Sequence, residues 1–313
     1  MSPEEPVTPA APSTPAGASM AAPFADAPLP EKRVPRVRPV GAPDVCEAAI
    51  ARALAGSRPM SPVVALGDFA AITWRYIMHF WRVPQLIVFS IIQPIMFVLL
   101  FRYVFGGAIN VPGGQYVNYL MPGIFVQTAL FGGASASIGL AYDLKGGIID
   151  RFRALPMARS AVLAGRTTTD FVRNVVVIAI MLSVGMLVGF RFHGSSWAHD
   201  LLGVLLVLAF GYAFSWFYAL IGLLVKDPET AQVAGFLPLF PLTFASSAFV
   251  PVQTMPGWLR GFATHQPVSI TVNAARALIN GQPSWHYTWQ LLLWVAGILA
   301  VFVPLSVRTY RRL

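Results

Sequence analysis

The residues of this chain that could do chemistry fall into two groups, a charged loop and a few polar side chains inside apolar stretches. The loop, residues 143–169, reads DLKGGIIDRFRALPMARSAVLAGRTTT, and its apolar residues recur at the spacing of an amphipathic helix. The pattern predicts a short helix with one charged side, ended by a proline. Its members are Gly147, Asp150, Arg151, Arg153, Leu155 and Pro156. The alternative is that the basic residues of the loop only fix membrane topology.

The second group consists of polar side chains within apolar stretches, where they could line a transport path. Its members are Gln93, Gln127, Thr128, Ser135, Ser137, Tyr212, Ser215 and Tyr218. The surrounding residues are apolar or aromatic and carry no fixed charge, which favours a hydrophobic or amphipathic cargo. Each polar side chain also has an alternative role, a hydrogen bond to a neighbouring helix.

Motifs of common enzyme chemistry are absent from the sequence. No G-x-x-x-x-G-K-[ST] phosphate loop, G-x-S-x-G nucleophile elbow or H-E-x-x-H zinc pair occurs. The histidines are scattered, and the single cysteine, Cys46, excludes a cysteine-built zinc site. No Asp or Glu lies in the middle of a predicted span, which argues against a proton- or sodium-coupled carrier. We therefore expect no cofactor, no metal and no enzymatic activity, and any energy source lies outside this chain.

The elements that must position these residues are membrane-spanning helices. The chain of 313 residues is 56% hydrophobic and 11% charged, whereas soluble domains contain about 25% charged residues. Six apolar stretches have about the length that a span requires. They cover residues 86–105, 120–142, 172–190, 201–225, 233–250 and 289–307. The sequence predicts an all-α polytopic membrane protein with six transmembrane helices.

The distribution of basic residues predicts that both termini lie in the cytoplasm. With that orientation, twelve Lys and Arg of residues 61–313 lie on inner flanks and only four on outer flanks, namely Arg102, Arg191, Arg260 and Arg276. The net charge of +9 therefore indicates membrane orientation rather than nucleic-acid binding. Residues 63–83 mix apolar, charged and tryptophan residues before Pro84, which predicts an amphipathic helix in the inner membrane interface.

Two further segments differ from the spans. Residues 1–60 are rich in Pro and Ala and lack apolar periodicity, so we expect a disordered cytoplasmic tail before a transmembrane domain of residues 61–313. The outer segment 251–288 is too long for a simple turn, and residues 270–278, closed by Gly281, predict a short amphipathic helix. The alternative for this outer segment is an ordinary interfacial loop.

Four stretches carry a more specific pattern. They read MPGIFVQTALFGG (121–133), GIIDRFRALPMARSAVLAGR (147–166), LLVKDPETAQ (223–232) and PLTFASSAFVPVQTMPGWLRGFATHQPVSITVNAARALINGQ (241–282). In this order they resemble the permeases of ABC type-2 exporters, most of all the daunorubicin-resistance (Drr) type, over residues 70–310. The sequence departs from that pattern at Tyr142 and Asp143, where many members carry a glutamate-containing pair.

The resemblance implies a transmembrane half without its own motor, because members pair two permease chains with two separate ATPase subunits. The implied partners are an ABC ATPase and a second permease copy, identical or related. The six charged-loop residues would then form the coupling helix that docks on the ATPase, with Asp227 and Glu229 in a second inner turn. The helix over 63–83 would be the connecting helix, and short outer helices would close the exit. In the family, spans one, two and five line the dimer interface, which favours Gln93, Gln127 and Thr243 as path-lining residues.

The expected function is therefore that of an ABC exporter permease in the bacterial cytoplasmic membrane. Its cargo would be a hydrophobic or amphipathic compound such as a drug, an antibiotic, a lipid or a polyketide. The alternatives are export of a lipid or glycan precursor, an ATP-independent carrier or channel, and an assembly protein without transport.

Overall fold

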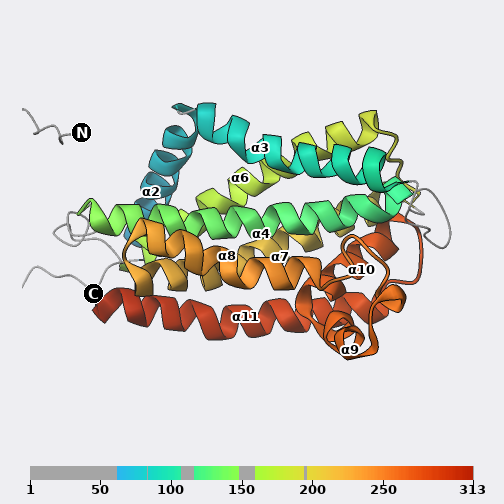
Figure 1. The fold of residues 1–313 in the computed structure, drawn as a ribbon. Helices are drawn as coiled ribbons and strands as arrows, with labels where there is room; N and C mark the ends of the chain where they lie inside the picture. Colours follow the sequence, from blue (N-terminus) through green and yellow to red (C-terminus); the bar gives the residue numbers. More distant parts are fainter. Residues whose placement is uncertain (1–61, 83, 107–115, 148–158, 194–195, 313) are drawn as a thin grey trace, which may run out of the picture. The chain divides into compact units, whose positions relative to one another are not determined.

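The computed structural model describes residues 62–82, 84–106, 116–147, 159–193 and 196–312, and every regular element within them is a helix. The elements are α2 (Pro62–Arg82), α3 (Pro84–Leu99), the π-helix η1 (Leu100–Phe105), α4 (Tyr116–Lys145), α6 (Arg159–Leu187), α7 (Trp197–Val225), α8 (Pro228–Phe244), the 3₁₀ turn η2 (Val252–Thr254), α9 (Gly257–His265), α10 (Pro267–Ile279) and α11 (Trp285–Arg312). Different elements lie at the two ends of the long helices: α2 is at one end, and α9 and α10 are at the other (Figure 1).

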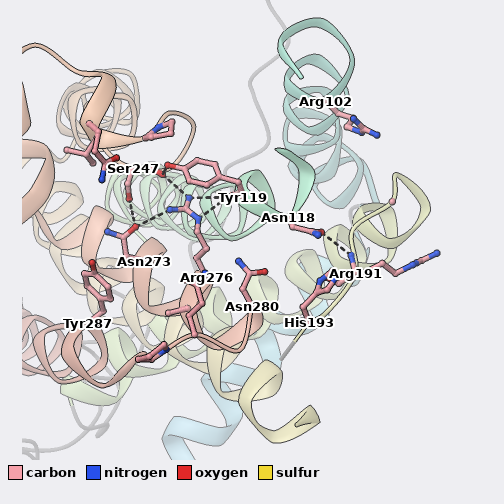
Figure 2. A pocket seen from close by; sticks show the side chains of 17 residues that line it. Arg102, Asn118, Tyr119, Arg191, His193, Ser247, Asn273, Arg276, Asn280 and Tyr287 are labelled. Carbon is pink, nitrogen blue, oxygen red and sulfur yellow. Dashed lines mark hydrogen bonds between the residues drawn. The ribbon is translucent and has the colours of Figure 1, made fainter. Parts of the chain in front are cut away.

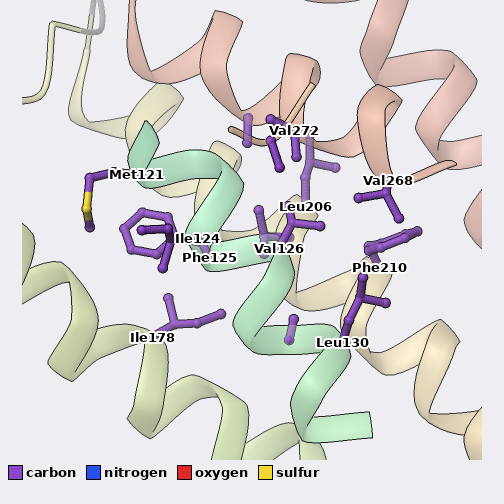
Figure 3. Close-up of a cluster of buried hydrophobic side chains, with 14 of the residues drawn as sticks. Met121, Ile124, Phe125, Val126, Leu130, Ile178, Leu206, Phe210, Val268 and Val272 are labelled. Atoms are coloured by element: carbon purple, nitrogen blue, oxygen red, sulfur yellow. The ribbon is translucent and has the colours of Figure 1, made fainter. Parts of the chain in front are cut away.

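The core forms around α4, which packs against α6, α7, α8 and α10. Its side chains Phe125, Val126 and Leu130 are fully buried among residues of α6, α7 and α10 (Figure 3). Because lipid is as apolar as these side chains, close packing rather than water exclusion holds such helices together. Gly222 of α7 illustrates this, since a Cβ at that position would overlap the backbone of Ser137 on α4.

Four of the described helices are long and apolar enough to cross a membrane: Tyr116–Lys145, Val162–Leu187, Trp197–Val225 and Trp285–Arg312. They coincide with the second, third, fourth and sixth predicted spans. The first predicted span is the continuous helical run 84–105, in which α3 passes directly into η1. At about 1.5 Å per residue this run is about 30 Å long. The count of six spans stays a prediction.

Two helices differ in extent from the predicted spans. The third helix begins at Arg159, before the predicted span at residue 172, and the charged residues in its first half pair with one another. The fifth stops at Phe244 instead of residue 250. Pro238 and Pro241 each remove a backbone donor from that helix, and the chain turns at Ala245, whose N–H bonds to the carbonyl of Pro241.

The predicted helices at both ends of the bundle are present. At one end, α2 covers the predicted interfacial segment, buries Ile72 and leaves Trp74 exposed. At the other end, α10 includes the whole predicted segment 270–278, and Gly281 follows it with a φ of 66°, a conformation that glycine adopts without strain. α10 is more than an interfacial loop, because it is buried against α4, α7 and α11.

Candidate functional site

The predicted second inner turn joins the end of α7 to the start of α8. Asp227 caps α8, and its carboxylate accepts hydrogen bonds from the backbone N–H and the hydroxyl of Thr230, each at 3.1 Å. The same carboxylate pairs with Lys145 Nζ at the end of α4, 3.0 Å away. The hydrogen bonds from Lys145 and Thr230 hold the pKa of Asp227 below its ordinary value. Glu229 lies exposed in the first turn of α8, so this end of the bundle presents two carboxylates.

The predicted coupling helix is described only at its first residue. Gly147 has a φ of 65° and follows α4 in a turn, in which its N–H bonds to the carbonyl of Leu144. The left-handed backbone conformation explains why a glycine occupies this position. The other predicted members, Asp150, Arg151, Arg153, Leu155 and Pro156, lie outside the described residues.

A buried group of four charged residues, here called the charge cluster, lies directly behind this end of the bundle. It consists of Asp143 on α4 and Arg166, Asp170 and Arg173 on α6. Arg166 pairs with Asp143 and lies 4.0 Å from Asp170, and Arg173 lies 3.7 Å from Asp170. The formal charges of the four residues cancel. Arg166, Asp170 and Arg173 are at positions i, i+4 and i+7, so one face of α6 carries all three.

The charge cluster also reaches the interfacial helix α2. The hydroxyl of Tyr76 donates a hydrogen bond of 3.0 Å to Asp143 Oδ2, and the Arg166 guanidinium lies 4.9 Å from the centre of the Tyr76 ring. Burial, with the neighbouring Asp143, raises the pKa of Tyr76 to about 12, so the hydroxyl keeps the proton that it donates. The cluster therefore joins α2, α4 and α6 by charged and polar contacts.

A cavity of about 290 Å³ lies between α3, α4, α6 and α8. It brings together four of the polar residues predicted to line a path, Gln93, Gln127, Thr128 and Ser135. Gln127 Nε2 is buried without a hydrogen-bond partner in the described structure, whereas the Thr128 hydroxyl donates to the carbonyl of Ile124. The remaining lining residues are Ser90, Pro94, Phe97, Phe131, Gly132, Arg173, Asn174, Val177 and Phe236.

Arg173 adds a charged residue to the lining of this cavity. The residue lines the cavity, pairs with Asp170 and donates a hydrogen bond to the carbonyl of Gly132 on α4. Asp170 lies in the first third of a helix that is long and apolar enough to span a membrane, ahead of the third predicted span at residues 172–190. A hydropathy average registers the charge of Asp170 but not the opposite charges of the arginines beside it.

Thr243 is not among the residues that line the cavity. It is fully buried near the end of α8, where its carbonyl accepts a hydrogen bond from the Ser246 hydroxyl, and its own hydroxyl has no partner in the described structure. Among the other polar candidates, Ser137 and Ser215 donate to carbonyls one turn earlier in their own helices. Those two side chains are therefore occupied within the bundle.

The charge cluster is the feature that the sequence reasoning missed. The signal was present in the spacing R-x-x-x-D-x-x-R over residues 166–173, in which each charge has an opposite neighbour one turn away. Asp143 gave no such signal, because its partner Arg166 is distant in sequence and is brought near by the packing of α6 on α4.

Comparison with known proteins places these features in a family context. Residues 67–280 match the family model described as ABC-2 type transporter. The chain is 34% identical to the daunorubicin resistance ABC transporter permease protein DrrB1 of Streptomyces coeruleorubidus, over 82% of this chain and 90% of that protein. It is 28% identical to the doxorubicin resistance ABC transporter permease protein DrrB of Mycobacterium tuberculosis, over 69% of this chain and 76% of that protein.

Proposed function

The chain belongs to the ABC-2 type transporter family and is a permease subunit of an ABC transporter, and we propose that it exports hydrophobic or amphipathic drugs across the bacterial plasma membrane. Membership implies an ATPase partner and a dimer of permeases, since a permease subunit of this family has no nucleotide-binding domain of its own. The relatives named for daunorubicin and doxorubicin resistance support cargos of that kind, which are flat, aromatic and amphipathic.

The observation that carries this proposal is the polar site in the cavity between α3, α4, α6 and α8, here called the central cavity. Gln127 Nε2 is a buried donor without a partner, and leaving such a donor unpaired costs about 1–3 kcal/mol. A cargo carbonyl or hydroxyl would satisfy it, while Phe97, Phe131 and Phe236 offer apolar ring surfaces around it. A few directed polar groups within a mostly apolar lining are typical of small-molecule sites.

We further propose that the ATPase docks at the end of the bundle that carries Gly147, Asp227 and Glu229. The segment with Asp150, Arg151, Arg153, Leu155 and Pro156 would supply most of that contact. Charges of both signs suit docking, because complementary charges fix the register between two partners. The charge cluster lies next to this end and touches three helices, so a push on the docking segment would reach α2, α4 and α6 together.

The test is ATP-driven uptake of doxorubicin into inside-out vesicles that contain this chain and its ATPase. We expect uptake that stops when the ATPase is inactivated. Gln127→Leu should lower doxorubicin uptake at least several-fold while leaving the thermal stability of the complex unchanged or slightly higher, because the substitution removes a buried unpaired donor. Ser183→Ala is the matched control, since that exposed hydroxyl bonds to a carbonyl of its own helix.

Three outcomes would contradict parts of the proposal. Uptake that follows the proton gradient without ATP would exclude ATP-driven export. Normal uptake by Gln127→Leu would remove the central cavity from the path. ATP-driven transport of a lipid or glycan precursor, with no transport of doxorubicin, would favour the alternative cargo class.

A further inference from the structure

A second and larger cavity, of about 990 Å³, lies at the end of the bundle opposite the turn with Lys145 and Asp227. We refer to it as the outer pocket. Its walls come from the end of η1, the start of α4, the turn after α6, α10 and the start of α11. Figure 2 shows Tyr119, Ser247, Asn273 and Arg276 joined by hydrogen bonds on one side, with Asn118, Arg191 and His193 on the other.

The outer pocket is cationic. Three arginines line it, Arg102, Arg191 and Arg276, and none of its lining residues in the described structure is acidic. The stretches 107–115 and 194–195, which are close to lining residues in the sequence, contain no Asp or Glu either. The positive-inside rule does not account for these arginines, because it favours basic residues at the cytoplasmic end of the bundle and the pocket lies at the predicted outer end.

Arg276 supplies a fixed charge. Its guanidinium lies 3.6 Å from the centre of the Tyr119 ring and donates to the carbonyls of Tyr119 and Ser247 and to Asn273 Oδ1, at 2.8–3.1 Å. All of these acceptors are neutral, so the hydrogen bonds hold the side chain in place without cancelling its charge. A partly buried, uncancelled cation creates a favourable potential for an anion nearby.

Arg102 differs from Arg276, because its guanidinium is available to a ligand. Its Nε is buried without a hydrogen-bond partner within the described residues, and the guanidinium carbon lies 6.0 Å from the centre of the Tyr103 ring. A guanidinium presents donors in a fork that fits two oxygens of a phosphate. Asn118, Asn280 and Tyr287 add neutral hydrogen-bonding groups to the same pocket.

The depth of the outer pocket indicates where such an anion would come from. Trp197, Trp258 and Trp285 begin or lie within helices at the same end and are 78%, 81% and 77% exposed. Exposed tryptophans are enriched at the level of the lipid head groups. Trp285 is also close in sequence to Tyr287 and Pro283, which line the pocket. The outer pocket therefore lies at the depth of lipid phosphates.

We propose that the outer pocket binds the phosphate of an anionic phospholipid of the outer leaflet, with Arg102 as the direct ligand and Arg276 as the supporting charge. A bound lipid would join η1 to α10 at the end where cargo would leave. The site is independent of which cargo the central cavity takes, so its test needs no transport.

The experiment measures lipid binding to the purified complex of this chain with its ATPase, by native mass spectrometry with phosphatidylglycerol and with diacylglycerol. We expect phosphatidylglycerol to bind in preference to diacylglycerol, and Arg102→Gln to weaken phosphatidylglycerol binding about tenfold, the loss of one charge-assisted contact. Arg260→Gln is the matched control: this arginine lies on α9 at the same end and bonds to backbone carbonyls, but does not line the pocket. Arg102→Glu, which reverses the charge, should abolish the preference.

Inorganic phosphate distinguishes the two sources of the anion. If excess phosphate leaves phosphatidylglycerol bound, the occupant is the membrane lipid; if it displaces the lipid in wild type but has no effect in Arg102→Glu, the pocket recognises the phosphate group itself. Both results support an anion site. Equal binding of phosphatidylglycerol and diacylglycerol, or unchanged binding in Arg102→Gln with an intact complex, would overturn the proposal.

Discussion

Arg166 shows how much a single residue contributes to holding this molecule together. Its guanidinium contacts Asp143 of α4, Asp170 of its own helix and the Tyr76 ring of α2. Burying these charges is costly, and the cost is offset only while each charge keeps its partner. The pairing explains why an arginine and two aspartates are tolerated inside the bundle, and why the losses from removing two paired members should not simply add.

We predict that Arg166→Gln and Asp143→Asn each lower the free energy of unfolding of the detergent-purified protein by about 3 kcal/mol, because each leaves the charge cluster with one uncompensated charge. The double variant should lose clearly less than the sum of the two single losses. Ser183→Ala serves as the control for unfolding measured by heat or denaturant. Strictly additive losses would show that the two side chains do not interact.

Asp227 makes a second prediction at the residue scale. Asp227→Ala should loosen the first turn of α8, seen as faster hydrogen exchange of its amides, because the cap and the Lys145 pair are both lost. Asp227→Asn keeps a cap acceptor and removes only the charge, so its exchange should be intermediate.

The same carboxylate has a pH dependence. Because its folded pKa is lowered, its stabilising effect is complete at neutral pH and is lost as the pH falls through that lowered pKa, below the range of an ordinary carboxylate. Exchange in Asp227→Ala should lack this acid-dependent step. An identical acid response in wild type and variant would contradict the assignment.

At the scale of the helices, close approach between neighbours determines how they pack. α4 lies at the centre because small residues let its neighbours come near: Gly222 of α7 meets the backbone of Ser137, and Gly123 of α4 meets the backbone of Ala248. Around these contacts the large side chains Phe125, Phe210 and Tyr218 fill the interior. The apolar sequence predicted helices, but not which glycines lie at helix contacts.

Gly222→Ala should therefore lower the free energy of unfolding by about 1–3 kcal/mol, because the added methyl would push α7 away from α4. Gly297→Ala on α11 is the matched control, since a Cβ there meets nothing within 4 Å. That variant should be neutral or stabilising by up to about 1 kcal/mol, the difference in helix propensity. Equal effects of the two substitutions would contradict the packing assigned to Gly222.

At the scale of the whole molecule, the two ends of the bundle have different chemistry. One end has the Lys145–Asp227 pair, the charge cluster and the interfacial helix α2, and the other has the outer pocket and exposed tryptophans. The central cavity lies between α3, α4, α6 and α8. This polarity suits a permease that receives a mechanical input at one face and releases cargo at the other.

The orientation can be tested with the single native cysteine. In intact cells, a membrane-impermeant maleimide should leave Cys46 unlabelled and should label Gly257→Cys in a Cys46→Ser background. Gly257 is suitable because it is exposed and a side chain there meets no neighbour. Permeabilised cells should show labelling of Cys46 as well. The reverse pattern in intact cells would show that the predicted inner and outer ends are exchanged.

The sequence by itself determined the class of this protein, a helical membrane permease without its own ATPase. The evidence was the length of the apolar stretches, the distribution of Lys and Arg, and four stretches that resemble the family. These signals are local and additive along the chain, so they need no knowledge of contacts. Gln93, Gln127 and Thr128 could be named for the same reason, as polar residues in apolar stretches. Only the tertiary structure decided that they meet in one cavity while Thr243 does not.

The charge cluster and the outer pocket depended on the tertiary structure entirely. A charge lowers the apparent hydropathy of a helix wherever it occurs, so the sequence placed Arg166 and Asp170 outside the third predicted span and Arg173 at its first turn. Packing α6 against α2 and α4 supplied the partners that make their burial possible. In the same way, Arg102 and Arg276 are far apart in sequence, and the packing of α10 beside the start of α4 places both on the wall of one cavity.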